Sequence, residues 1–223
     1  MILVIDGRPL IQKKAGIGAY TAEFISHFAD IFKDWQIIII SPKRLHNSVE
    51  SIVNKSNVTV DICPLLGGKL PNMIWFYFYS AIHAKKLGAD FFISTVTQYP
   101  FFLDKKIKYV MTVNDFVVKD FAYTMTLQNR LSSFFFDYSI NKAKNIWCIS
   151  HYTQRQLVDR FPHKASTHFF IGITVSDIYK RINLTDDERM SLMSKYGISN
   201  SFIMFVGSLE PRKNLKFLLK LSP

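Results

Sequence analysis

The chain has 223 residues, of which 48% are hydrophobic and only 9 are glycine, a composition that can build a substantial core and excludes collagen-like and linker-like classes. Lysine and arginine outnumber the acidic residues by 28 to 17, and the net charge of +11 favours anionic partners such as nucleic acid, lipid headgroups or phosphorylated metabolites. The most apolar stretch, residues 74–82, is far shorter than the ~20 residues of a membrane-spanning helix, and no secretory signal is visible. We therefore expect a protein that is soluble or peripheral to a membrane.

Short apolar runs alternate with helical patterns through the first three quarters of the chain. The spacing of Tyr20, Phe24 and Phe28 predicts a helix that begins at Ile17. Strands are expected over 2–6, 37–40, 58–62, 91–94, 109–113 and 146–150, with 168–172 closing this half, and further helices over 75–87, 126–143 and 151–161. Such alternation favours an α/β fold, a Rossmann-like doubly wound parallel sheet that binds ligands at the carboxyl ends of its strands.

The character of the sequence changes near residue 180. Thr185 followed by Glu188 is a capping-box pattern and Gly197 a helix stop, which predicts a connector helix within 179–200. The apolar run 202–207 then predicts a strand, and a helical pattern follows it. We therefore expect a first domain over 1–178, a connector over 179–200, and the first strand and helix of a truncated second domain over 201–223.

The two cysteines, Cys63 and Cys148, are far apart in the sequence and form no paired motif. Cys148 lies in an apolar run and is expected to be a buried thiol. A structural zinc site needs about four clustered ligands, and the sequence shows no such cluster. We therefore expect no metal and a reducing, cytoplasmic location.

The stretch KKAGIGAYTAEF (13–24) places Gly16 and Gly18 in front of the first helix. It is a poor dinucleotide fingerprint, because Thr21 stands where the third glycine belongs. One interpretation is a loop that only lets the chain turn into the helix. The other is an anion site, since the amides at a helix start bind phosphate groups.

Two other motifs end predicted strands and offer polar side chains. In GSLEPRKN (207–214), Arg212 and Lys213 would stand near a helix start, suited to a diphosphate unless they form a solvated basic turn. In TVNDF (112–116), Asn114 and Asp115 could hydrogen-bond a polyhydroxylated ligand or form an ordinary turn.

In CISHYTQRQL (148–157), Ser150 and Thr153 are most simply helix-capping residues. His151 beside Ser150 suggests a hydrolase only superficially, because no G-x-S-x-G elbow is present.

The segment WFYFYSAIHAKKL (75–87) is rich in aromatic residues and is followed by Lys105, Lys106 and Lys108. Aromatic residues of a helix between a sheet and solvent usually belong to the core. The alternative is docking on an anionic membrane surface. No RNA-binding signature is present, so we expect no nucleic-acid partner.

Taken in order, the segments IDGRPL, AGIGAYT, TVNDF, CISHYTQRQL and FVGSLEPRKNL resemble the family 4 retaining glycosyltransferases of the GT-B fold. Many members of that family act in bacterial polysaccharide or lipopolysaccharide assembly, often as mannosyltransferases. The resemblance spans nearly the whole chain, and the last segment is the most specific.

The resemblance implies two Rossmann-like domains, the first binding a glycan or lipid-linked acceptor and the second a nucleotide-diphosphate sugar. It implies that Gly16 and Gly18 approach the donor diphosphate from the first domain, that Arg212 and Lys213 neutralise it from the second, and that no metal is needed. Asn114-Asp115 stands where the family usually has a His-Asp pair near the transferring sugar.

The family's two-glutamate motif belongs further into the second domain than Pro223. The resemblance therefore implies a truncated transferase with weak or no activity alone, or one paired with a separate donor-domain chain. The rival interpretations are a non-catalytic, basic membrane-docking or glycan-binding module and, more remotely, a Rossmann oxidoreductase.

Overall fold

A computed structural model describes the chain apart from residues 14–15, 121–126, 174–178, 200, 208, 210–212 and 221–223. The chain divides into two compact units, Met1–Ser176 and Asp177–Pro223. No helix of the described residues is both long and apolar enough to cross a bilayer.

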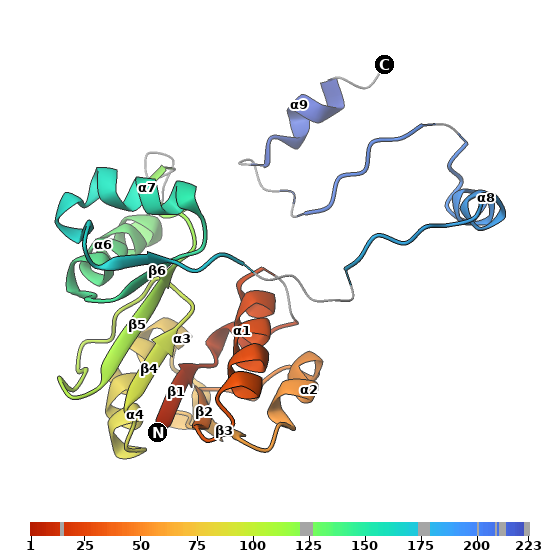
Figure 1. The fold of residues 1–223 in the computed structure, drawn as a ribbon. Coiled ribbons are helices and arrows are strands. Elements are labelled where there is room, and N and C mark those ends of the chain that lie inside the picture. Colours follow the sequence, from red (N-terminus) through yellow and green to blue (C-terminus); the bar gives the residue numbers. More distant parts are fainter. Residues whose placement is uncertain are drawn as a thin grey trace. The chain divides into compact units, whose positions relative to one another are not determined.

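The first unit is built on a seven-stranded sheet in which every pairing is parallel (Figure 1). The strands are β1 (Ile2–Asp6), β2 (Gln36–Ser41), β3 (Val58–Ile62), β4 (Phe91–Ser94), β5 (Lys108–Val113), β6 (Ile146–Cys148) and β7 (His168–Phe170). Their spatial order is β3-β2-β1-β4-β5-β6-β7, so the direction of winding reverses between β1 and β4. This order confirms the Rossmann-like doubly wound sheet, and the reversal marks the point where such sheets bind ligands.

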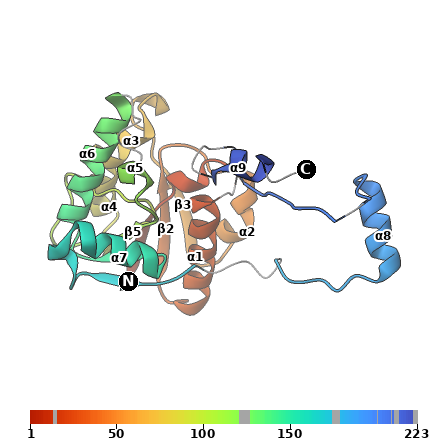
Figure 2. The same cartoon turned by 90° about the horizontal axis from the view of Figure 1, so that it is seen from above.

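Helices cover both faces of this sheet (Figure 2). They are α1 (Ile17–Ile31), α2 (Glu50–Val53), α3 (Asn72–Trp75), the π-helical turn η4 (Phe76–Ser80), α4 (Ala81–Lys86), α5 (Val117–Asp120), α6 (Leu127–Lys142) and α7 (His151–Arg160). Short 3-10 turns are η1 (Arg8–Leu10), η2 (Asn47–Val49), η3 (Leu66–Gly68) and η6 (Pro162–Lys164).

The alternation of side chains along each strand divides the core into two clusters. Leu3 and Ile5 of β1 pack with buried residues of α1 and α2 on one face. Val4 points to the other face, where the buried residues come from α3, η4, α4, α6 and α7. Because both faces of the central strands are buried, these strands are continuous apolar runs, such as Ile37–Ile40 of β2.

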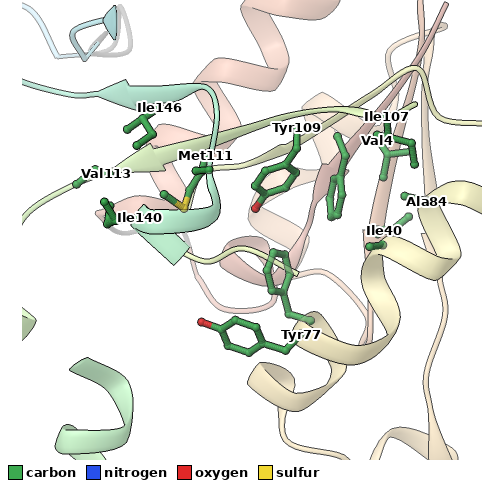
Figure 3. Packing of buried hydrophobic residues seen from close by; sticks show 14 of the residues in the cluster. Val4, Ile40, Tyr77, Ala84, Ile107, Tyr109, Met111, Val113, Ile140 and Ile146 are labelled. Carbon is green, nitrogen blue, oxygen red and sulfur yellow. The ribbon is translucent and has the colours of Figure 1, made fainter. Parts of the chain in front are cut away.

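The aromatic segment belongs largely to the second of these clusters. Trp75, Phe76 and Tyr77 are buried, and Figure 3 shows Tyr77 in the cluster that also contains Tyr109 and Met111 of β5. Phe76 and Tyr77 are covered from different sides, because Phe76 packs on Phe92 of the sheet and Tyr77 packs on Phe135 of α6. The exposed exception in η4 is Phe78, whose side chain is 48% accessible.

Most predicted boundaries agree with the structure, and the differences have local causes. The expected strands 2–6, 58–62 and 91–94 match β1, β3 and β4. β6 ends at Cys148 rather than residue 150, because Ser150 accepts a hydrogen bond from the amide of Thr153 and caps α7. The helix expected over 75–87 begins at Asn72 and runs through η4 into α4.

The second unit contains two helices among its described residues, α8 (Asp186–Lys195) and α9 (Leu215–Lys220). The predicted capping box is present, since Thr185 accepts from the amide of Glu188 and the Glu188 carboxylate accepts from the amide of Thr185. Gly197 follows the helix with a φ of 64°, as a helix stop requires.

The strand predicted over 202–207 is wrong. The segment has no regular structure, and Phe202, Ile203, Met204 and Val206 are all exposed. A strand needs a neighbour for its N–H and C=O groups, and the described part of the second unit supplies none. Apolar residues that favour strands are therefore not sufficient to make this segment a strand.

A buried ion pair organises the carboxyl end of β1. Both oxygens of the fully buried Asp6 carboxylate accept from Arg8, with Oδ1 2.9 Å from Nε and Oδ2 2.6 Å from Nη2. Oδ2 also accepts from the hydroxyl of Ser94, at the end of β4, at 3.0 Å. The Arg8 guanidinium lies 3.8 Å from the centre of the Phe76 ring. The network therefore joins both strands of the winding reversal to the helix that begins at Asn72.

Replacing Asp6 by asparagine tests the importance of this pair. Breaking a buried ion pair leaves an uncompensated charge and costs about 3–5 kcal/mol, so we expect Asp6→Asn to lower the free energy of unfolding by that amount in urea denaturation. Asp30→Asn is the matched control, because Asp30 pairs with Lys55 at the surface with its side chain 63% exposed. Its unfolding midpoint should not change measurably, and equal effects of the two variants would contradict the assignment.

Candidate functional site

A cavity of about 280 Å³ opens beside the carboxyl ends of β4 and β5. Its apolar wall includes Ile17 at the start of α1 and Phe135 of α6. Its polar lining comes from Tyr77, Thr97, Gln98, Asn114, Asp115 and Ser132. The cavity thus lies at the edge where a doubly wound sheet binds ligands, next to the winding reversal.

Asn114 and Asp115 both line this cavity, as their position after β5 predicted. The Asn114 side-chain amide donates to the carbonyl of Thr95 at 2.9 Å, and its backbone carbonyl accepts from the hydroxyl of Thr153 at 3.1 Å. Asp115 is exposed, and its Oδ1 accepts from the amide of Val117 at 3.2 Å. Asn114 is therefore held at both its backbone and its side chain, whereas the Asp115 carboxylate remains open to solvent.

The start of α1 is tied to the end of β4 by a pair of buried hydroxyls. The Oγ1 atoms of Thr21 and Thr95 lie 2.6 Å apart, and Thr21 Oγ1 also donates to the carbonyl of Ile17 at 2.7 Å. Thr21 therefore fixes the first turn of α1 next to the cavity that Ile17 lines. The same residue stands where a dinucleotide fingerprint would have its third glycine.

Gly16, which precedes α1, and Gly18, within its first turn, are each required to be glycine by a different local constraint. Gly16 is exposed and has a φ of 49° and a ψ of −115°, a conformation that side chains rarely allow. Gly18 is buried, and a Cβ atom there would lie 2.6 Å from the carbonyl oxygen of Pro9. Gly18 therefore lets α1 pack closely on η1, while Gly16 sets the entry of the chain into the helix.

One buried acceptor in the lining, Gln98 Oε1, has no hydrogen-bond partner among the described residues. The backbone of Gln98 is held, since its amide donates to Val96 at 2.8 Å and its carbonyl accepts from the Tyr109 hydroxyl. Tyr77 also lines the cavity, with its hydroxyl 3.4 Å from the Ser139 hydroxyl, and burial raises the pKa of its phenol. The lining thus offers a neutral amide, an amide oxygen, hydroxyls and one carboxylate, a set suited to a polyhydroxylated ligand.

Ser150 and Thr153 form the cap of α7, as predicted. The Ser150 hydroxyl accepts from the amide of Thr153 at 3.0 Å, and Thr153 links this cap to Asn114. His151 stacks on Phe170, with ring centres 4.0 Å apart, and its Nδ1 lies 3.3 Å from Gln154 Oε1. The Ser150 hydroxyl therefore caps the helix, and the contacts of His151 are with Gln154 and Phe170, so they do not support a hydrolase.

The basic half of the predicted diphosphate site lies in the second unit. Lys213 is exposed, and Arg212 lies outside the described residues. Their approach to Gly16 and Gly18 remains a prediction.

No family model matches the chain, and no curated protein matches it. Among solved structures, the chain is similar over 89% of its length to a crystal structure of a glycosyltransferase from Rickettsia africae ESF-5, with 14% sequence identity and a TM-score of 0.48. The chain spans half the length of that protein. Similarity this low carries no functional information, and the fold class stands on the strand order and the parallel pairings.

Sequence reasoning missed the residues that follow β4. Thr95, Thr97 and Gln98 occur in the run STVTQYP, directly after a predicted buried strand. A polar run at the end of a buried strand is itself a signal for the ligand edge of a parallel sheet. The partnership of Thr95 with Thr21 has no such signal, because 74 residues separate the two hydroxyls.

A pair of substitutions tests the hydroxyl contact that positions α1. Thr21→Val leaves the buried Thr95 hydroxyl unpaired and should lower the free energy of unfolding by about 1–3 kcal/mol. Thr95→Val should cost less, because Thr21 still donates to the Ile17 carbonyl. The double variant should therefore be no less stable than Thr21→Val alone. Urea denaturation measures all three, and losses that simply add would contradict the contact.

Proposed function

We propose that this chain carries the acceptor-side half of a glycosyltransferase, which transfers a hexose from a nucleotide-diphosphate sugar to a glycan or lipid-linked acceptor. The observation that carries the proposal is the cavity at the winding reversal, where Asn114 and Asp115 meet the start of α1. Its polar lining can hydrogen-bond sugar hydroxyls. The resemblance of the five sequence segments to retaining family 4 enzymes favours this chemistry over other uses of a Rossmann-like sheet.

The proposed reaction exchanges one bond of the sugar for another. The bond between the anomeric carbon and the donor diphosphate breaks, a bond to an acceptor hydroxyl forms, and the proton of that hydroxyl leaves with the diphosphate. In this proposal the helix-start amides at Gly16 and Gly18 and the cations Arg212 and Lys213 stabilise the leaving diphosphate, so no metal is required. Asn114 and Asp115 would face the transferring sugar and the acceptor.

The finer assignments follow from the resemblance alone. They are a retaining outcome, mannose as the first sugar to test, and a role in cell-surface polysaccharide or lipopolysaccharide assembly on the inner face of the cytoplasmic membrane. A separate chain that carries the nucleotide-sugar pocket is a further proposed partner.

The test compares two asparagines whose side chains donate to a backbone carbonyl, one at the carboxyl ends of the strands and one at their amino ends. Asn114 donates to the Thr95 carbonyl beside the cavity, and Asn145 donates to the Tyr109 carbonyl before β6 begins. We expect Asn114→Ala to weaken acceptor binding, and any transfer of labelled hexose, by about 10-fold, the value of one hydrogen bond. Asn145→Ala should affect stability alone.

Calorimetry with lipid-linked glycan acceptors and a transfer assay with nucleotide sugars provide the two measurements. Binding that depends on Asn114 supports the acceptor site even where transfer is absent. A folded protein that binds neither acceptors nor nucleotide sugars would overturn the proposal.

A second candidate function, a non-catalytic membrane-docking or glycan-binding module, is favoured by one surface feature. Phe78 of η4 and Phe102 are 48% and 56% exposed, and both rings contact Phe101, with centres 4.9 Å and 6.5 Å apart. Lys105 and Lys106 follow in the same loop and are exposed. Exposed aromatic rings beside lysines are typical of surfaces that dock on anionic lipid.

Co-sedimentation with vesicles that contain anionic lipid tests this second function. At low salt we expect the wild type to sediment, and Phe78→Ser and Phe102→Ser each to weaken binding by about 10-fold, because each ring would lose its burial in the lipid. Phe169→Ser is the matched control, since this ring is 57% exposed on β7. Raised salt should weaken the binding by screening the lysines. A wild type that stays in the supernatant at low salt would rule out docking.

A further inference from the structure

Three side chains with metal-binding atoms converge at the edge of the sheet, away from the cavity at the winding reversal. Asp61 is the second-last residue of β3, Cys63 directly follows that strand, and His83 lies on α4. One carboxylate oxygen, the thiol sulfur and one ring nitrogen lie within 4.8 Å of one another. None of the three lines the cavity that contains Asn114.

The fold holds Cys63 in place by its backbone. Its amide donates to the carbonyl of Ser41 at 2.9 Å, which extends the pairing of β3 with β2 by one residue. Its carbonyl accepts from the indole N–H of the buried Trp75 at 2.9 Å. Asp61 stands two residues earlier, so the alternation of the strand directs both side chains to the same face. That face is the one α4 covers, which brings His83 to them.

His83 is oriented from both ring nitrogens. Nε2 lies 2.8 Å from Asp61 Oδ2, and Nδ1 lies 3.4 Å from the hydroxyl of Tyr79, one turn earlier in the helix. The two rings also stack, with an interplanar angle of 27°. Histidines that bind metals commonly have the nitrogen opposite the metal held by such a partner. The arrangement leaves Nε2 as the ligand atom and Tyr79 as the group that orients the ring.

We propose that Asp61, Cys63 and His83 bind a zinc ion. A thiolate, an imidazole and a carboxylate are the ligands that zinc takes in proteins, and three protein ligands leave the fourth tetrahedral position to water or to an exogenous ligand. Zinc bonds of about 2.0–2.3 Å separate neighbouring ligand atoms by roughly 3.3–3.8 Å. The 2.8 Å contact of His83 with Asp61 must then open by roughly 0.5 Å, a shift within the reach of side-chain rotation.

Charge and exposure fit a cation at this point. The carboxylate and a thiolate would together balance the two positive charges of zinc. Burial raises the pKa of the Cys63 thiol to about 12, so the incoming ion must displace the thiol proton, as zinc does at coordinating cysteines. The Asp61 side chain is 35% exposed, which gives the ion a path from solvent.

The simpler interpretation is an Asp61–His83 ion pair beside an inert thiol. Titration of the purified chain with Co²⁺, which reports its ligands optically, separates the two. We expect one Co²⁺ per chain, a thiolate-to-cobalt charge-transfer band, and displacement of the cobalt by one equivalent of Zn²⁺. A wild-type protein that shows no charge-transfer band would overturn the proposal without recourse to any variant.

Substitutions assign the ligands. Cys63→Ser should abolish the charge-transfer band, and Cys148→Ser, which alters the other buried free cysteine, should leave it unchanged. Tyr79→Phe should weaken zinc binding by about 10-fold, the lower end of the loss seen for groups that orient a metal-bound histidine. Circular dichroism of each variant confirms folding, and Zn²⁺ should raise the melting temperature of the wild type but not that of His83→Gln. A band that survives Cys63→Ser would contradict the assignment.

Discussion

The buried pair of Asp6 and Arg8 is the interaction on which the order at the carboxyl ends of the strands depends. Parallel strands expose their last carbonyls and side chains at one edge, and nothing in the strand pairing alone orders the loops that follow. Asp6 accepts from Arg8 and from Ser94, and Arg8 packs on Phe76, so one carboxylate connects both strands of the winding reversal to a covering helix. The charges can be buried there because each is satisfied by several partners.

The sheet could be predicted because its signals are local. Ile37–Ile40 is a continuous apolar run because both faces of its strand are covered, and Ser150 begins a helix because its hydroxyl satisfies a free amide in the next turn. The carboxyl-edge positions of Asn114 and Asp115 followed from the same reasoning. The segment 202–207 shows the limit, since its apolar residues form no strand where the described part of the second unit offers no strand to pair with.

The contacts that shape the sites could not be predicted, because they join residues that are far apart in the chain. The hydroxyls of Thr21 and Thr95 meet across 74 residues, and His83 meets Asp61 across 22. Neither contact joins residues that are close in the sequence, and the two cysteines form no paired motif. Such contacts appear only once the order of strands and the covering helices are known.

The π-helical turn at Phe76–Ser80 has a consequence for both ends of the helix that contains it. A π turn holds one residue more than an α turn, so it shifts the phase of everything after it by about 100°. The part before the turn is aligned so that Trp75 donates to the Cys63 carbonyl, and the part after it so that His83 reaches Asp61. In an uninterrupted α-helix, position 83 would be rotated by about 100° relative to Trp75. The extra residue in the π turn therefore places Trp75 and His83 on the same side of the helix, facing the end of β3.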